Sequence, residues 1–284
     1  MRRLAPATAI AVLLLTSLSG CFLIPQAPQP EAGSGGAAAN GFGNIGDCWE
    51  AKYADLAEWS SWEGDGPVDC NENHQSYTFF VGELETEVTS AWQDGSLTDE
   101  LATAISDECA PHLLDLGVPD SAARAGGYFF VAPEKEWENG DHRIRCDVAV
   151  SALDSDWSKP KLEKLPADIN DLVADIDKNS RSYELCLMGD GYGPYDSTEA
   201  YYMDCATGDY YWRYAGEVEY PSDAPDPYPT PESFSAFAEI DCAALGLRAD
   251  ETVLPYFPSQ EMWDSGYRAV TCWFSLVEAP SKPV

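Results

Sequence analysis

KEWENGDHRIRC at residues 135–146 and EMWDSGYRAVTC at residues 261–272 share the pattern W-x2-G-x5-C, in which tryptophan, glycine and cysteine fall at the same offsets. Glycine readily adopts the backbone angles of tight turns, so Gly140 and Gly266 predict a hairpin turn in each stretch. Cys146 and Cys272 then lie on the returning strands. A pattern this long occurring twice indicates an internal duplication.

The cysteines extend this duplication over most of the chain. There are nine, and eight remain when Cys21, which belongs to the N-terminal segment, is set aside. An even number predicts disulfides if the chain is exported, as its N-terminus indicates below, because exported thiols seldom stay reduced. The eight fall into two quartets of similar spacing: Cys48, Cys70, Cys109 and Cys146, followed by Cys186, Cys205, Cys242 and Cys272.

Three pairing patterns remain if each quartet closes on itself in the same way. We favour the pattern in which the first cysteine pairs with the second and the third with the fourth. Each bond would close a loop of about 20 to 40 residues and contribute about 3 to 4 kcal/mol. The competing interpretation is a reduced, metal-binding quartet. The chain lacks the C-x2-C and C-x4-C spacings of zinc sites, so we expect neither a metal nor another cofactor.

Hydrophobic patterns predict the same elements in the same order around each quartet. The first cysteine opens a short strand, and the second begins a longer one in which apolar residues alternate over residues 77–81 and 210–214. The third cysteine falls in a helix. In the first helix Pro111 should kink or shorten the last turns, and in the second Thr230 is the expected N-cap, with Pro231 at the first position and Gly246 at the end.

These elements predict an α+β fold of two tandem disulfide-stapled repeats, each roughly β-β-α-β-β. We place repeat 1 at residues 46–158 and repeat 2 at residues 183–280. An amphipathic helix at residues 159–182 joins them, with Ile169, Leu172, Val173 and Ile176 on one face. We expect this helix to pack one repeat against the other.

The N-terminus, MRRLAPATAIAVLLLTSLSGC, predicts a lipoprotein signal peptide at residues 1–20. Leu-Ser-Gly-Cys resembles a bacterial lipobox, in which Cys21 becomes the lipid-bearing terminus. An ordinary secretory signal is the alternative. Residues 21–45 are rich in proline, glycine and alanine and predict a flexible tether. We therefore expect the protein to be lipid-anchored on the extracytoplasmic face of the cell membrane.

Charge excludes one class of partner. The chain has 49 acidic and 16 basic residues, a net charge of -33. A surface this negative repels nucleic acid and anionic lipid headgroups, so we expect no nucleic-acid partner and membrane contact only through the N-terminal lipid. The hydrophobic fraction of 45% supplies enough apolar surface for a core.

A family resemblance rests on three motifs: GDC at residues 46–48, D-C-x3-H at residues 69–74 running into YTFFVGEL, and the closing W-x2-G-x5-C. Together they resemble the septum-formation-related domain of actinobacterial exported lipoproteins, over roughly residues 46–280. The resemblance implies a membrane-anchored cell-envelope protein with a cell-wall or divisome partner. It brings no catalytic residues, and the second repeat departs from it where Asp209 matches His74.

No catalytic residue is predicted from the motifs either, since neither G-x-S-x-G nor H-E-x-x-H occurs. His74 beside Asp69 and Glu72 could act as a general base, but a structural hydrogen bond is the favoured interpretation. A carboxylate-dependent cell-wall glycan hydrolase stays open as an alternative, because 49 acids offer many pairs whose separations the sequence does not give. A purely structural spacer is a third possibility.

Aromatic residues in the loops are the better candidates for partner binding. Trp59 and Trp62 are flanked by serine and glutamate, and Tyr192 and Tyr195 lie in a glycine-rich loop of the second half. The same loop, residues 189–200, contains three acids that could suggest calcium. It lacks the ligand order of a calcium loop, so an ordinary acidic turn is favoured. We expect a non-enzymatic envelope protein that binds its partner through loop aromatics.

Overall fold

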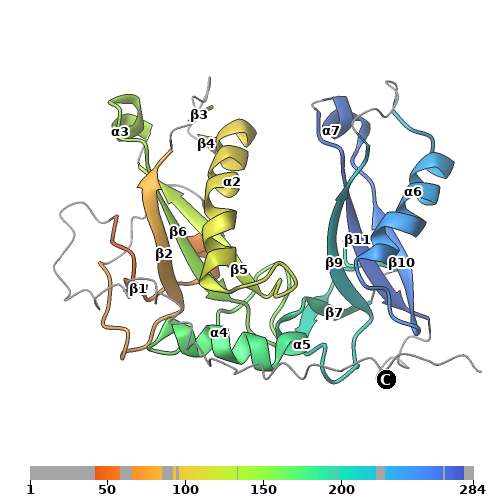
Figure 1. Ribbon diagram of the computed structural model, residues 1–284, viewed down its shortest axis with the longest axis horizontal. Coiled ribbons are helices and arrows are strands. Elements are labelled where there is room, and N and C mark those ends of the chain that lie inside the picture. The colour runs from red at the N-terminus through yellow and green to blue at the C-terminus, as the bar shows by residue number, and fades with distance from the viewer. Residues whose placement is uncertain are drawn as a thin grey trace, which may run out of the picture. The chain divides into compact units, whose positions relative to one another are not determined.

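Two antiparallel β-sheets, each accompanied by one longer α-helix, form the fold in the computed structural model of this protein (Figure 1). The chain divides into two units, residues 1–31 and 32–284, and every described residue belongs to the second. The structure describes residues 42–57, 66–84, 92–93, 96–132, 134–190, 192–195, 197–221, 228–264 and 266–277. The α+β class predicted from the sequence is confirmed. Among the helices in these ranges, none has the length and apolar character needed to cross a membrane.

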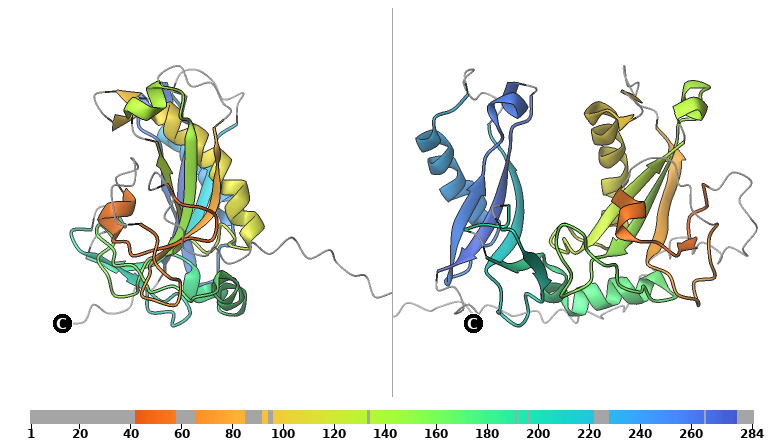
Figure 2. Two further views of the ribbon diagram at one scale, coloured as in Figure 1. Left: turned by 90° about the vertical axis from the view of Figure 1, so that its left-hand side faces the viewer. Right: turned by 180° about the vertical axis from the view of Figure 1, so that it is seen from behind.

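The first sheet has the strand order β1-β2-β6-β5. Its strands are β1 (Cys48–Trp49), β2 (Ser76–Glu83), β5 (Ala125–Val131) and β6 (Arg143–Val150). Helix α2 (Asp99–Leu116) packs on one face, where Leu101 and Ile105 join a core with Val148. Helix α1 (Tyr53–Ala57) packs on the other face, where Leu56 joins Phe130. The right-hand view of Figure 2 shows α1 beside this sheet.

The second sheet has the strand order β10-β11-β9-β7-β8. Its strands are β7 (Cys186–Gly189), β8 (Ala200–Met203), β9 (Trp212–Glu219), β10 (Glu251–Tyr256) and β11 (Ala269–Leu276). Helix α6 (Pro231–Ala244) covers one face, where Phe234 and Ala238 pack with Val270. Pro255 lies within β10, which is an edge strand of this sheet. A proline is tolerated there because an edge residue need not donate a backbone hydrogen bond to a neighbouring strand.

The two sheets share their central order of strands. In each, the short strand with the first cysteine pairs with a long strand, and the long strand pairs with the strand that holds the fourth cysteine. That strand pairs in turn with β5 or β10. A register shift falls beside the fourth cysteine in both sheets. Several elements were not predicted: α1, β8, the β3 (Trp92–Gln93) and β4 (Ser96–Leu97) hairpin, and helices α3 (Glu134–Glu138), α5 (Ser180–Tyr183) and α7 (Gln260–Asp264).

Four disulfides join the cysteines in the favoured pattern. The bonds are Cys48–Cys70, Cys109–Cys146, Cys186–Cys205 and Cys242–Cys272. Two of them fasten a helix to a sheet, since Cys109 and Cys242 lie in α2 and α6 and their partners lie in β6 and β11. The other two fasten a turn to a sheet.

The second cysteine of each quartet was expected to begin a strand, and this was wrong. Cys70 and Cys205 lie in turns, and the long strands begin only at Ser76 and Trp212. The aspartate before each cysteine causes the turn, because its carboxylate accepts a hydrogen bond from the backbone N–H two residues further on. These bonds are Asn71 to Asp69 and Ala206 to Asp204, both 2.9 Å long.

The tryptophans of the W-x2-G-x5-C pattern begin no hairpin strand. Trp137 lies in α3 and Trp263 in α7, and both side chains are buried. Each short helix sits between two paired strands, so the chain still reverses as predicted. Gly140 and Gly266 have φ angles of 95° and 102°, which favour glycine and let the chain leave each helix.

Helix α2 continues through Pro111 to Leu116, so its last turns are not shortened, and the kink expected as the other possibility stays a prediction. Proline removes one backbone hydrogen bond, but both ends of the helix are well capped. The hydroxyl of Thr98 accepts from the N–H of Leu101, and Gly117 closes the C-terminus with a φ of 99°. The disulfide of Cys109 lies only two residues before the proline and holds this part of α2 on the sheet.

The predicted connecting helix is α4 (Ile169–Lys178), with Asp168 as its N-cap. Its apolar face is buried, but Ile169, Leu172 and Ile176 join the core of the first sheet. The expectation that these residues would pack one half against the other is therefore wrong. The first sheet has room for them beside α2, where Val173 approaches Gly117 closely.

Candidate binding surface

The residues predicted to bind a partner are placed by the structure only in part. Trp59 and Trp62 lie outside the described residues, and so does Cys21, the predicted lipid attachment point. Tyr192 and Tyr195 lie in the loop that joins β7 to β8. Both are exposed, 96% for Tyr192 and 53% for Tyr195, so this loop carries the described part of the predicted surface.

Asp190 holds this loop in shape. Its carboxylate accepts hydrogen bonds from the backbone N–H and the hydroxyl of Thr198 and from the hydroxyl of Ser197. These bonds lower the pKa of Asp190 below its ordinary value, with the hydroxyl of Thr198 as the largest cause. The carboxylate therefore serves its own loop, in the manner of the acidic turn favoured from the sequence. Asp196, another of the three acids, lies outside the described residues.

Tyr195 packs against three other aromatic rings. Its ring centroid lies 4.5 Å from that of Tyr256, 5.3 Å from Trp157 and 6.1 Å from Trp273. Tyr214 packs edge-on against Trp273 with a centroid distance of 5.4 Å. We call Trp157, Tyr195, Tyr214, Tyr256 and Trp273 the aromatic surface. Tyr195 is its exposed ring, whereas the rings of Trp157, Tyr214 and Tyr256 are partly buried and that of Trp273 is fully buried. Tyr192 has no ring contact with another described residue, so it is not counted in this surface.

The aromatic surface lies on the face of the second sheet that points away from α6. Cys272 is joined to α6, and successive side chains of a strand point to opposite faces, so Trp273 points away from the helix. Tyr214 lies beside Trp273 in the ladder. Trp157 reaches the same place from the segment before α4, where its backbone N–H donates to the oxygen of Ala200 over 2.8 Å.

Glu217 lies beside the aromatic surface on the same face. Its carboxylate accepts hydrogen bonds from the hydroxyl groups of Tyr267, at 3.2 Å, and Thr271, at 3.1 Å. Burial first, and then the charge of Glu217, raise the pKa of Tyr214 and of Tyr267 to about 12. Both phenols are therefore neutral at physiological pH, in a region of negative potential.

The corresponding face of the first sheet is built around a buried arginine. Arg145 precedes Cys146 on β6 and lies with its guanidinium carbon 4.1 Å from the ring centroid of Trp49 and 4.2 Å from that of Phe130. Its Nε lies 3.1 Å from a carboxylate oxygen of Asp147, and both side chains are fully buried. The first sheet therefore encloses one of its own cations between two aromatic rings.

Asp147 completes this buried network. Its carboxylate accepts hydrogen bonds from the hydroxyls of Ser76, at 2.9 Å, and Thr78, at 2.7 Å. The indole N–H of Trp49 donates to the hydroxyl oxygen of Thr78 over 2.8 Å. Burial raises the pKa of Asp147, because removal of the carboxylate from water outweighs the attraction of Arg145 and the hydroxyl donors. These bonds join buried side chains to one another, so within the described residues the network presents no polar group to a partner.

His74, the one histidine considered as a base, is fully buried. Its Nδ1 lies 3.2 Å from the backbone oxygen of Glu72, to which the Nδ1–H can donate. Its Nε2 is enclosed and has no hydrogen-bond partner within the described part of the chain. The carboxylate of Asp69 binds Asn71 instead. This contact agrees with the structural role favoured from the sequence and not with a base held by carboxylates.

The carboxylates were also considered as a hydrolytic pair. A cavity of about 350 Å³ beside α4 is lined in part by Glu163 and Asp175. Glu163 forms an ion pair with the buried Arg124, and Asp175 accepts a hydrogen bond of 2.7 Å from the hydroxyl of Tyr183. Both of these carboxylates are engaged within the chain, so Glu163 and Asp175 do not favour the glycan hydrolase alternative as its pair; Asp171 also lines the cavity.

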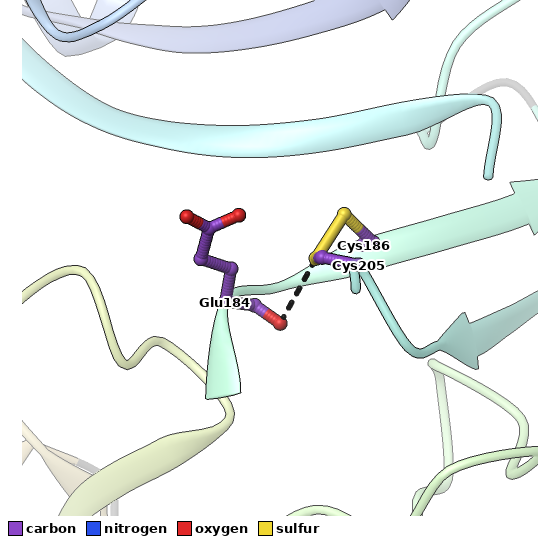
Figure 3. Close-up of side chains that lie close together, drawn as sticks. All are labelled: Glu184, Cys186 and Cys205. Carbon is purple, nitrogen blue, oxygen red and sulfur yellow. Dashed lines mark hydrogen bonds between the residues drawn. A yellow bond between two sulfur atoms is a disulfide. The ribbon is translucent and has the colours of Figure 1, made fainter. Parts of the chain in front are cut away.

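Glu184, Cys186 and Cys205 lie close enough together to resemble a metal site (Figure 3). The two sulfur atoms are bonded to each other and cannot serve as thiolate ligands. Figure 3 shows the carboxylate of Glu184 apart from the disulfide, and this carboxylate accepts two hydrogen bonds from Arg248, at 2.8 and 3.0 Å. The group therefore stabilises the start of β7.

Two antiparallel sheets, four disulfides and a cluster of rings with Tyr195 at its exposed edge define a disulfide-stabilised α+β protein with a candidate binding surface. The family model described as septum formation matches residues 45–272. This chain therefore belongs to the septum formation family, as its motifs indicated. No curated protein and no solved structure matches the chain significantly.

Proposed function

We propose that this protein is a lipid-anchored, extracytoplasmic binding protein that takes part in septum formation. The family match over residues 45–272 carries the proposal. Four disulfides support an exported location, because such bonds persist in oxidising compartments. The sequence Leu-Ser-Gly-Cys before and at Cys21 supports the anchor.

We also propose that residues 46–158 and 183–280 are two copies of one ancestral unit. The shared order of the four central strands supports this, together with the equal placement of the disulfides. The register shifts beside Cys146 and Cys272 support it further, because such irregularities are usually kept within a family. Helix α1 would then be a later addition to the first copy, and strand β8 a later addition to the second.

Binding is the activity that the geometry supports best. The aromatic surface offers the exposed ring of Tyr195 beside the partly buried rings of Trp157, Tyr214 and Tyr256, which pack over the buried Trp273. Exposed aromatic side chains are enriched at binding sites. Asp190 fixes the loop that carries Tyr195, which lowers the entropy that a partner must pay to order it. Trp59 and Trp62 are proposed as a second contact region from the sequence.

The anchor is tested by the Cys21→Ser variant of the full chain. We expect the natural protein to sediment with membranes, resist washing with high salt, and carry a lipid on Cys21 in mass spectrometry. The variant should lack the lipid and be released from the membrane. A variant that remains with washed membranes would show that the protein is held by something other than lipid.

The role in septum formation is tested in cells that naturally produce the protein. Removal of the protein should delay or misplace septa, seen as longer cells by microscopy. The natural chain should restore division, and a chain with Tyr195→Leu and Tyr214→Leu should not. Tyr192→Ser is the matched control, because Tyr192 is more exposed but makes no ring contact with the aromatic surface. Normal septa in the absence of the protein would contradict the proposal.

A further inference from the structure

Arginine over an aromatic ring is the recurrent way in which this chain holds its own cations. The described residues contain seven of the nine arginines, since Arg2 and Arg3 fall outside them. Five of the seven lie within 5.8 Å of a ring centroid. They are Arg124, Arg143, Arg145, Arg213 and Arg268, over Tyr183, Phe42, Trp49, Phe274 and Trp263 respectively.

The aromatic surface occupies the position that holds Arg145 in the first sheet. Arg145 precedes Cys146 and pairs across the ladder with Phe130. In the second sheet Thr271 precedes Cys272 and pairs with Tyr256. The first sheet thus has a cation between its rings, whereas the second has the small side chain of a threonine.

The surroundings of the aromatic surface favour a positive charge. No lysine or arginine within the described ranges lies over the rings of Trp157, Tyr195 or Tyr214. Glu217 lies on the same face, and within the described part of the chain it accepts hydrogen bonds only from neutral hydroxyls, those of Tyr267 and Thr271. The chain as a whole has a net charge of -33. A ring face attracts a cation through its quadrupole, and the attraction strengthens where water is partly excluded.

We propose that the aromatic surface, with Glu217 beside it, binds an arginine-containing segment of a protein partner. A guanidinium group would lie against the ring of Tyr195 or Tyr214 and reach the carboxylate of Glu217. Arginine suits this place better than lysine, because its planar group stacks on rings and donates several hydrogen bonds in one plane. The inference rests on the proposed function as a binding protein and names the chemistry of its partner.

The direct test is a titration with short peptides. The full-length chain, held in non-ionic detergent, is titrated with a glycine- and serine-rich peptide that carries two arginines. A second peptide carries citrulline in their place, which keeps the shape of arginine and removes its charge. We expect the arginine peptide to bind at least about fivefold more tightly, the ratio of one or two cation–ring contacts. Raising the salt concentration from about 20 mM to about 200 mM should weaken its binding, since this shortens the screening length.

Single substitutions locate the site. Tyr195→Leu should weaken binding of the arginine peptide about two- to fivefold, and Tyr195→Phe should restore most of it, because phenylalanine keeps the ring face. Glu217→Gln should weaken binding by about threefold at low salt and reduce the salt dependence. Glu217 and Tyr195 are exposed, so both variants should fold, which circular dichroism checks. Tyr192→Ser should bind like the natural chain.

Three outcomes would overturn the inference: equal binding of the citrulline peptide, no binding of either peptide, or binding that neither Tyr195→Leu nor Glu217→Gln weakens. Displacement of the arginine peptide by a neutral cell-wall glycan fragment would also overturn it and would assign the surface to sugars. The cellular experiment separates the two levels. If the peptides fail but the Tyr195→Leu and Tyr214→Leu chain still fails to restore septa, the binding role stands and only the partner's chemistry is wrong.

Discussion

Arg145 shows how a charged residue can become part of a core. Arg143, Arg145 and Asp147 alternate along β6 with apolar residues, which predicts a polar face open to water. The chain before β2 covers this face instead, with Trp49 over the guanidinium and Phe42 accepting a hydrogen bond from it. No local pattern in residues 143–150 indicates this cover, because it comes from a segment about one hundred residues away.

Loss of either partner of the buried pair should destabilise the protein strongly. Arg145→Met leaves Asp147 buried without its cation, so we expect the free energy of unfolding to fall by about 3 to 5 kcal/mol. The double variant Arg145→Met, Asp147→Leu should recover much of this loss, because no buried charge is left alone. Denaturant unfolding followed by tryptophan fluorescence measures both. Asp141→Asn is the control, since its ion pair with Arg143 is partly exposed and should contribute less than about 1 kcal/mol.

Glu251 predicts a specific dependence of stability on pH. Burial acts to raise its pKa, but hydrogen bonds from Arg213, from the backbone of Arg248 and from Tyr210 outweigh burial and lower the pKa below 4.5. The folded pKa therefore lies below that of the unfolded chain. The stability that this carboxylate contributes is present above about pH 4.5 and is lost as the pH falls through the folded pKa.

The comparison is between the natural chain and Glu251→Gln. We expect the difference in their free energies of unfolding to be largest near pH 7 and to shrink below about pH 4.5. Using a difference removes the general effect of protonating the other acids. Glu239→Gln, an exposed change on α6, should show no such trend. A difference that stays constant down to about pH 3 would contradict the assignment.

The helices and strands could be predicted where local chemistry decides them. Thr230 is the N-cap of α6, and the i, i+3, i+4, i+7 stripe of α4 is buried as a helix. The shortening considered for Pro111 does not occur, because the caps and the disulfide of α2 outweigh one missing hydrogen bond. The strand expected after Cys70 begins later, because Asp69 forms a turn that competes with the sheet. The surface against which α4 packs is set by residues far away in the sequence, so it was not predictable from the helix itself.

The disulfides between helix and sheet should contribute most to the stability of the elements that they join. Replacing Cys242 and Cys272 together by alanine opens a loop with a separation of 30 residues, and we expect a loss of about 4 kcal/mol. Amide hydrogen exchange should accelerate first in α6. The control is the same change at Cys186 and Cys205, whose separation of 19 residues predicts a somewhat smaller loss. Equal exchange in α6 with and without its disulfide would contradict this role.

The charge of the whole molecule is its most extreme property, and the sequence alone predicts its consequence. A net charge of -33 produces repulsion that the folded state concentrates into a smaller volume.

The location of the aromatic surface was not predictable from the sequence. Trp157, Tyr214 and Trp273 come from segments far apart in the chain, and only Tyr195 was expected. The sequence shows only that the chain is rich in aromatic residues, and this does not tell which of them lie in the core and which at the surface.

Because salt screens the repulsion among the acidic residues, it should stabilise the protein. Raising sodium chloride from about 10 mM to about 150 mM shortens the screening length from about 30 Å to about 8 Å, and we expect the melting temperature to rise by a few degrees, about 2 to 4 °C. Calorimetry measures the change. At about pH 4, where many carboxylates are protonated, the same addition should have a smaller effect. A melting temperature that falls with salt would mean that attractive ion pairs outweigh repulsion.

Pro255 has a consequence for how neighbouring copies meet. It stands in the outermost strand of the second sheet, with its missing N–H on the side that faces away from β11. A strand from another copy that paired with this edge would lack one backbone N–H donor, that of residue 255. Growth of the sheet from molecule to molecule at this edge is thereby discouraged.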